Sequence, residues 1–332
     1  MKRILQVCLV LGTLTLEATA QSPTATRTSP LKTGIAQFDA EKLDQAKATL
    51  LPLAKAGDAD AMLYLGRIAI EQSDGDSAVS WIEQAIRKND RSSTYYQWLG
   101  SAYSLKVISA NPLARMSLAT SLKHAMERAV ELDSTNIEAR INLLQFYLQA
   151  PAMMGGGVDK AREQAAAIMA RDPYQGRLQN ASIAENQGDT LDAEVLLRDA
   201  RATFPDSSAP ATRLAIHYFN AKLYDDAFRV LENRLRRSPN DAAALYQLGR
   251  VGAVSGAKLD RAQWALDRFL QMPHKRGTPS IASAHWRMGM ILEAKGDRAK
   301  ARAEYETAVR LDPKLAGAQA SLDKLKQGVS LG

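Results

Sequence analysis

Side chains that could serve as nucleophiles or bases do not gather into a catalytic motif in this sequence. Ser321 and Lys324 have the Ser-x-x-Lys spacing of a serine nucleophile and its lysine base, and Lys32-Thr33-Gly34 matches a triplet that accompanies it. The two motifs occur in reversed order at opposite ends of the chain, which indicates chance matches. The sequence therefore predicts no catalytic residue, and we expect a protein that is not an enzyme.

Residues that could bind a metal are equally scattered. None of the four histidines has a second histidine at the i+3 or i+4 spacing that places two ligands on one helix face: His124, His217, His274 and His285. Asp58 with Asp60, and Asp74 with Asp76, lie in turns without the closing glutamate of a calcium loop, so we expect helix capping there. No metal and no cofactor are predicted.

A glycine-rich stretch at 149–161, QAPAMMGGGVDKA, raises the question of phosphate binding. A phosphate loop needs Gly-x-x-x-x-Gly-Lys-Ser/Thr after a strand, whereas this stretch follows the helical ARINLLQFYL and has no hydroxyl after Lys160. Asp159 is expected to cap the next helix and to occupy the N–H groups that an anion would need. Two interpretations remain open: a structural turn with glycine at positive φ, or a contact loop that presents Met153 and Met154 to a partner.

The composition is that of a soluble helical protein. Of 332 residues, 46% are hydrophobic and 24% charged, and the mean hydropathy is −0.26, so the chain can build a large core. Alanine is abundant, and valine, isoleucine and threonine rarely alternate with polar residues, so we expect a mostly helical fold. The net charge of +7 comes from basic residues that alternate with acidic ones, which argues against nucleic-acid binding.

Residues 1–20 have the pattern of a secretory signal peptide. Lys2-Arg3 precedes the apolar run Ile4–Leu16, and Ala18-Thr19-Ala20 supplies the small residues of a cleavage site. The run is too short to span a bilayer, so we expect cleavage after residue 20 and a periplasmic or secreted bacterial protein with no membrane span. Cys8 is the single cysteine, so cleavage would exclude disulfides and thiolate chemistry from the mature chain.

Beyond a polar, proline-containing tether at 21–33, the chain is repetitive. Pro205 and Pro239, for example, are 34 positions apart (239 − 205). This period and the recurring order of small and large residues resemble the tetratricopeptide repeat, a helix–turn–helix unit. The resemblance implies an all-α, right-handed superhelical solenoid of about seven repeats, the first degenerate, which forms one domain over 34–332 and ends in a capping helix.

The repeat pattern also predicts local packing and loops. Glycines such as Gly66, Gly100 and Gly249 are expected to let the two helices of a hairpin approach closely. Residues 93–205 are similar to a group of exported bacterial repeat proteins with the same long repeat and Pro-x-Gly-Gly turn. Three stretches lengthen the period and are expected to form loops: 107–116, 150–158 and 272–280.

In proteins of this family, the inner face of each first helix contacts extended peptides. By register, the resemblance places the following residues in that groove: Arg67, Gln97, Gln145, Phe219, Tyr246, Arg250 and Trp286. Tyr246, Arg250 and Trp286 are of types favoured at binding hot spots and come from adjacent repeats, although Tyr246 and Trp286 could instead pack between hairpins. The resemblance thus implies an exported scaffold or adaptor that binds a protein or peptide segment, in envelope or secretion-system assembly. The alternative is a non-catalytic carrier or auxiliary subunit that binds an envelope glycan or a small ligand.

Overall fold

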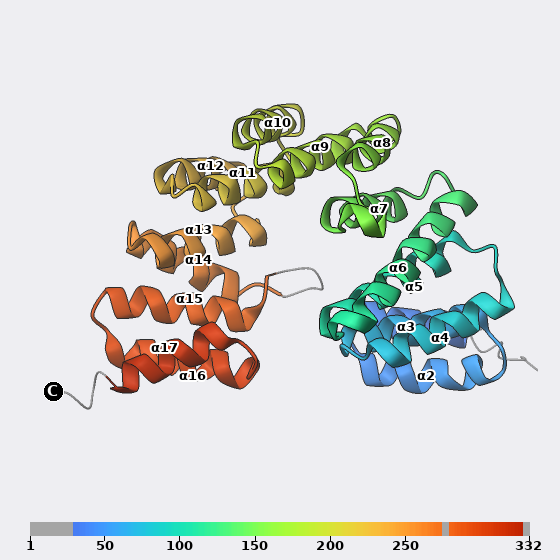
Figure 1. Ribbon diagram of the computed structural model, residues 1–332. Helices are drawn as coiled ribbons and strands as arrows, with labels where there is room; N and C mark the ends of the chain where they lie inside the picture. The colour runs from blue at the N-terminus through green and yellow to red at the C-terminus, as the bar shows by residue number, and fades with distance from the viewer. Residues whose placement is uncertain (1–28, 274–278, 328–332) are drawn as a thin grey trace, which may run out of the picture.

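The computed structural model describes residues 29–273 and 279–327, and within these ranges the chain is helical, with no strand. Its helices pair into antiparallel hairpins that follow one another around an arch (Figure 1). The predicted all-α solenoid is therefore confirmed.

The described residues form eight hairpins and a closing helix, α17 (Ala316–Gln327). The hairpins are α1 (Pro30–Asp39) with α2 (Leu43–Lys55), α3 (Ala59–Glu71) with α4 (Gly75–Lys88), α5 (Ser93–Ser109) with α6 (Pro112–Leu132), α7 (Ile137–Gln149) with α8 (Val158–Met169), α9 (Pro173–Gln187) with α10 (Thr190–Thr203), α11 (Ser208–Asn220) with α12 (Tyr224–Arg237), α13 (Ala242–Ser255) with α14 (Leu259–Leu270), and α15 (Ile281–Ala294) with α16 (Arg298–Leu311). The expected number was about seven. The structure describes eight, and the hairpins of irregular spacing, α5/α6 and α7/α8, are both complete.

Aspartates begin many of these helices. The carboxylates of Asp58, Asp74, Asp189 and Asp297 each accept a hydrogen bond from the backbone N–H three residues later, at 2.9–3.1 Å. Each bond satisfies one of the N–H groups that the first turn of a helix leaves without a partner. The capping role that the sequence predicted for Asp58 and Asp74 is confirmed.

One packing contact recurs inside the hairpins. A glycine of the first helix lies directly under a large side chain of the second helix, so close that an added Cβ would collide with it. The pairs are Gly34 with Leu50, Gly66 with Ile82, Gly100 with Met126, Gly249 with Leu266, and Gly289 with Tyr305. The predicted close approach of the two helices is thus confirmed. Gly34 of the Lys-Thr-Gly triplet belongs to this series, which gives the triplet a packing role.

The first hairpin begins earlier than the sequence indicated. Residues 30–33, which the sequence predicts as part of the tether, form the first turn of α1. The Ser29 hydroxyl accepts from the N–H of Lys32, and Pro30 occupies the first helical position, where its missing N–H leaves no bond unmade. The predicted signal peptide and residues 21–28 of the tether lie outside the described residues.

The prediction of a loop at 107–116 is wrong. The added residues lengthen α5 and α6 instead, and only two residues separate these helices. Asn111 caps α6 through the N–H groups of Leu113 and Ala114, which restarts the helix at once. The extension carries three apolar side chains into solvent: Ile108, 78% exposed, Leu113, 86%, and Met116, 51%. Of the third stretch, 272–280, the centre at 274–278 lies outside the described residues.

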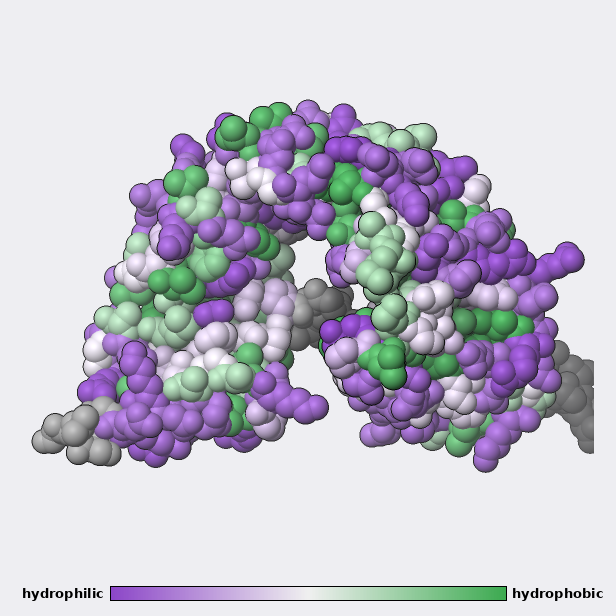
Figure 2. All heavy atoms as spheres, in the orientation of Figure 1, coloured by the Kyte–Doolittle hydropathy of each residue, from purple (hydrophilic) through white to green (hydrophobic). Residues whose placement is uncertain are grey.

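The first helices lie on the inner side of the arch. Successive first helices contact one another, as α3 does α5, α11 does α13 and α13 does α15, whereas successive second helices make at most marginal contact in the described ranges. Because first helices approach more closely than second helices, the stack curves with the first helices inside. At the top of the arch, α7 and α9 lie inside α8 and α10 (Figure 1). Figure 2 shows the open space that the two arms enclose.

Candidate functional site on the inner face

Two of the predicted groove residues, Arg67 and Arg250, occupy the same position in their repeats. Each follows the packed glycine of its first helix, Gly66 in α3 and Gly249 in α13. The side chains are therefore presented by equivalent backbone, one in each arm of the arch. Their surroundings differ.

Arg67 is enclosed by aromatic rings. Its guanidinium carbon lies 4.6 Å from the ring centroid of Phe38, 4.5 Å from that of Tyr64 and 4.4 Å from that of Trp98. These rings come from α1, α3 and α5, so the cation–π contacts connect three successive first helices. The Nε atom of Arg67 is buried and makes no hydrogen bond. The arrangement indicates that Arg67 serves packing.

Arg250 is less enclosed. Its guanidinium carbon lies 4.2 Å from the ring of Phe219 on α11, and its Nη1 donates to Gln247 at 3.2 Å. No carboxylate among the described residues forms an ion pair with it. The ring covers one face of the guanidinium, and no carboxylate of the described residues neutralises its charge.

A second arginine, Arg287 of α15, lies near enough to Arg250 for the two charges to interact. Burial lowers the pKa of the Arg287 guanidinium, the charge of Arg250 lowers it further, and contact with Tyr246 acts in the opposite direction. The guanidinium carbon lies 3.9 Å from the ring of Trp286, and the Nε atom is buried without a hydrogen-bond partner. Arg287 was not predicted from the sequence, although it lies next to the predicted Trp286. Two adjacent repeats thus place two like charges together on the inner face.

Tyr246 and Trp286 are partly buried in packing. The Tyr246 ring lies 5.7 Å from that of Phe269, beside the core. The Trp286 indole donates to the hydroxyl of Ser321 at 3.0 Å, and its ring covers Gly317, both on α17. Trp286 therefore holds the closing helix in place, which also gives Ser321 a structural partner. A partner-binding role for these two rings stays a prediction.

The predicted amides form hydrogen bonds between hairpins. The Gln97 side-chain oxygen accepts from the amide of Asn136 at 3.0 Å, and the Gln145 amide donates to the oxygen of Gln179 at 3.3 Å. Asn136 also donates to the hydroxyl of Ser93 at 2.8 Å. These bonds fix the amides against the next repeat, and binding of a partner through them stays a prediction.

The turn between α7 and α8 uses its own N–H groups. Gly155, Gly156 and Gly157 donate to the carbonyls of Ala152, Pro151 and Tyr147, respectively. Gly155 has φ +88, and a Cβ on Gly156 would collide with the carbonyl of Ala150, so two of the glycines are required by the backbone. No N–H group of the three glycines is left for an anion.

The cap predicted for α8 is wrong. Asp159 lies inside the helix, which begins at Val158 after Gly157, and its carboxylate pairs with Arg162 at 3.0 Å. The structure also separates the two methionines of the turn. Met153 is 83% exposed, whereas Met154 packs against the core and lines an apolar cavity of about 590 Å³ between α5, α6 and α7.

Tyrosines connect successive hairpins. Tyr103 of α5 donates to Glu83 of α4 at 3.0 Å, and Tyr147 of α7 donates to Glu127 of α6 at 3.1 Å. Burial, together with the adjacent glutamate, raises the pKa of both phenols, that of Tyr147 to about 12. Each bond joins a first helix to the second helix of the preceding hairpin and so serves the stacking of the hairpins.

The part of the chain that the structure describes contains no group of three potential metal ligands among histidine, cysteine, aspartate and glutamate. None of its helices combines the length and the apolar character needed to cross a membrane. One of the histidines, His285, has its Nδ1 2.6 Å from the carboxylate of Glu304.

Family models described as tetratricopeptide repeat match residues 31–93, 186–251 and 282–315. The first match includes the hairpin α1/α2, the repeat expected from the sequence to be degenerate. No curated protein sequence matches the chain.

Several solved structures are similar at low sequence identity. A tetratricopeptide repeat protein from Parabacteroides merdae has 15% identity and a TM-score of 0.49, over 81% of this chain and 98% of that chain. The APC/C hetero-tetramer Cut9–Hcn1 has 15% identity and a TM-score of 0.48, over 89% of this chain and 55% of that chain. Pseudomonas aeruginosa pilF has 18% identity and a TM-score of 0.45, over 71% and 98%, respectively.

Proposed function

Because the chain is a tetratricopeptide-repeat protein, we propose that it is an exported, non-catalytic scaffold that binds a segment of a partner protein along its inner face. The observation that carries this proposal is the arginine pair of the C-terminal arm. Arg250 and Arg287 lie on adjacent first helices beside aromatic rings, and neither has a carboxylate partner among the described residues.

The pair favours an acidic side chain on the partner. Two adjacent guanidinium groups repel each other, and a carboxylate placed between them would relieve that repulsion and form charge-assisted hydrogen bonds. Phe219 and Trp286 already stack on the two guanidinium groups, so less side-chain freedom is lost on binding. The segment we propose is an extended peptide that carries at least one aspartate or glutamate opposite this pair.

The N-terminal pattern supports export, and the setting we propose is the assembly of an envelope or secretion complex. The test is the mass of the mature protein after expression of the full chain in a Gram-negative host. A periplasmic product that begins at Gln21 is expected. A cytoplasmic product that retains residues 1–20 would contradict export and leave the groove proposal to its own test.

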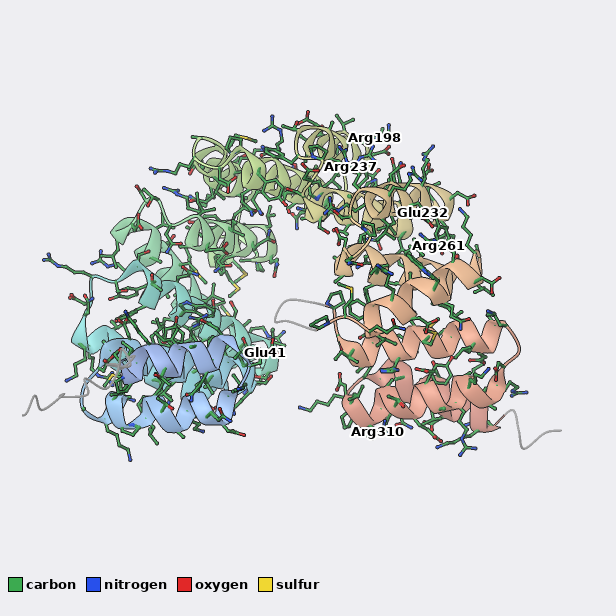
Figure 3. The ribbon with its side chains drawn as sticks, turned by 180° about the vertical axis from the view of Figure 1, so that it is seen from behind. Glu41, Arg198, Glu232, Arg237, Arg261 and Arg310 are labelled. Carbon is green, nitrogen blue, oxygen red and sulfur yellow. The ribbon has the colours of Figure 1, made fainter. Side chains whose placement is uncertain are left out.

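Binding is tested by capture from envelope extract with the wild type, Arg250→Ala and a control, Arg310→Ala. Arg310 is an exposed arginine on the second helix α16, at the foot of the C-terminal arm (Figure 3). Acidic segments of the captured proteins are then resynthesised as peptides and titrated. We expect Arg250→Ala to weaken peptide binding by roughly tenfold and Arg310→Ala to leave it unchanged. Equal binding by all three proteins would sink the proposal, and glycan binding without a protein partner would favour a carrier.

The turn at 150–158 supplies a second candidate contact. Met153 is 83% exposed and is followed by Met154, which lines the apolar cavity together with Ile108, itself 78% exposed. An exposed methionine next to an apolar hollow favours contact with apolar side chains of the partner. Met153→Ser should weaken capture and leave stability unchanged, whereas Met154→Ser should lower stability because Met154 packs on the core. Unchanged capture by Met153→Ser would leave only the structural turn.

A further inference from the structure

We propose that a cavity on the outer side of the solenoid, between α10 and α12, binds a phosphate-type oxyanion. The cavity has a volume of about 540 Å³ and is separate from the inner face, because it involves second helices. Its walls hold four arginines, Arg201 of α10 with Arg234, Arg236 and Arg237 of α12, and its lining includes no acidic residue.

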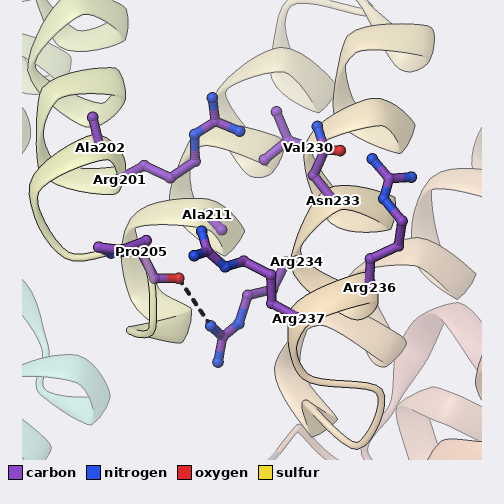
Figure 4. Close-up of a pocket in the computed structure, with 9 residues that line it drawn as sticks. All are labelled: Arg201, Ala202, Pro205, Ala211, Val230, Asn233, Arg234, Arg236 and Arg237. Carbon is purple, nitrogen blue, oxygen red and sulfur yellow. Dashed lines mark hydrogen bonds between the residues drawn. The ribbon is translucent and has the colours of Figure 1, made fainter.

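The arginines around the cavity differ in how they are used. Arg234 is 8% exposed and is held in place by two hydrogen bonds. Its Nε donates to Asp241 at 2.5 Å, and its Nη1 donates to the carbonyl of Pro205 at 3.2 Å. Arg201 and Arg237 have no ion pair or hydrogen bond among the described residues. Figure 4 shows these two side chains directed into the space between the helices, with Arg234 turned to Pro205.

In neighbouring hairpins, arginines form ion pairs with carboxylates. Examples are Arg177 with Asp199, Arg213 with Glu185, and Arg261 with Glu232. Arg236 lies at the edge of the cavity, near enough to Glu232 to help lower the pKa of that carboxyl, although Arg261 is the main cause. The charge without an internal counter-ion is therefore concentrated on Arg201 and Arg237, which lie on helices of two different hairpins.

The chemistry of the cavity fits a tetrahedral anion with several oxygens. A guanidinium presents a planar fork of N–H donors that matches the oxygens of phosphate, and two forks from opposite walls can share one group. The side-chain amide of Asn233, also in the lining, adds a donor. The apolar residues Ala211 and Val230 in the lining limit hydration, which strengthens the attraction between charges.

Basic residues also occur at the ends of other helices, where they stabilise the C-terminal end of the helix dipole. This provides a matched control. The equivalent alanines Ala227 and Ala301 are 74 positions apart (301 − 227), and so are Arg236 and Arg310 (310 − 236). Arg310 therefore occupies, at the end of α16, the position that Arg236 occupies at the end of α12. Arg310 lies far from the cavity (Figure 3) and is exposed. If these arginines only stabilise helix ends, substitutions at the cavity and at Arg310 should affect phosphate binding alike. If the cavity is an anion site, only the substitutions at the cavity should weaken phosphate binding.

The experiment titrates inorganic phosphate and pyrophosphate into the full chain at constant ionic strength, by calorimetry and by the shift in melting temperature. The variants are Arg201→Gln, Arg201→Gln/Arg237→Gln and the control Arg310→Gln. We expect the wild type and Arg310→Gln to bind pyrophosphate and to melt at higher temperature with it. The double variant should bind roughly tenfold or more weakly, and the single variant should be intermediate.

A second arm distinguishes a free anion from a lipid headgroup. Phosphatidylcholine vesicles with and without phosphatidylglycerol are sedimented with the same four proteins. Binding of the wild type only to phosphatidylglycerol vesicles, lost in the double variant, would support the site with a lipid-borne phosphate. No binding in either arm would overturn the proposal. Equal losses in the double variant and Arg310→Gln would also overturn it, because they would indicate general attraction to a basic surface.

Discussion

Arg67 and Arg250 occupy equivalent positions in two repeats, yet their environments have little in common. Around Arg67, the neighbouring first helices α1 and α5 contribute Phe38 and Trp98, and the guanidinium is enclosed. Around Arg250, α11 contributes Phe219 and α15 contributes a second arginine, so charge is left uncompensated. The repeat decides where a side chain lies, and the adjoining repeats decide whether it is available to a partner.

The largest expected effect is a loss of stability on substitution of the packed glycine that precedes each of the two arginines. Gly66→Leu and Gly249→Leu force a side chain against Ile82 and Leu266, so each should lower the free energy of unfolding by about 3 kcal/mol. Urea unfolding measures it, with Ala299→Leu at an exposed helical position as the control that should change little. A large loss in one arm only would show that the two hairpins are not equivalent scaffolds for their arginines.

The next effect tests the difference directly. Arg67→Ala should lower the free energy of unfolding by about 2 kcal/mol, because three ring contacts are lost, whereas Arg250→Ala should lower it by less than about 1 kcal/mol. Arg67→Met should recover much of the loss, since it keeps the packing and removes the buried Nε without a partner. Equal losses at both positions would remove the distinction between a packing arginine and a binding arginine.

The smallest effect concerns pH. The pKa of Tyr147 is raised to about 12 in the folded protein, against 10.0 for the unperturbed phenol. The folded state therefore holds this proton more tightly, and the resulting stability is complete below pH 10 and is lost as the pH rises from 10 through 12. Arginines keep their charge in this range, so the ring contacts of Arg67 and Arg250 should persist.

Urea unfolding at alkaline pH measures this loss in the wild type and in Tyr147→Phe. At neutral pH, the free energy of unfolding of Tyr147→Phe should be lower than that of the wild type by about 1 kcal/mol, because the variant lacks the hydrogen bond to Glu127. Above pH 10, the free energy of unfolding of the variant should fall less steeply with pH than that of the wild type, since one titrating phenol is gone. An identical decline would place the alkaline sensitivity in other groups.

The helical repeats and the close glycine contacts could be predicted from sequence, because both depend on residues within one hairpin. The wrong predictions involve competition between local signals. At 107–116, Asn111-Pro112 is a strong helix start, and it restarts the helix instead of opening a loop. At α8, Gly157 precedes the helix, so Asp159 falls within its first turn.

The candidate sites were harder to predict, because they combine residues from different repeats. The rings around Arg67 come from three hairpins, and their convergence depends on how far each hairpin rotates against the next. Arg201 and Arg237 likewise belong to separate hairpins. The basic run at the end of α12 is visible in the sequence. The cavity, however, also requires Arg201 of α10, and its position opposite that run could not be predicted from the sequence.

The pairing of a glycine with a large side chain in the same hairpin has a kinetic consequence. Gly34 and Leu50, or Gly289 and Tyr305, are separated by only one turn and parts of two helices, so the contact order is low. Each hairpin can close early and locally, and folding can then propagate in both directions from any of them. Because every interface is with a neighbour, a hairpin that closes slowly delays only the propagation across it.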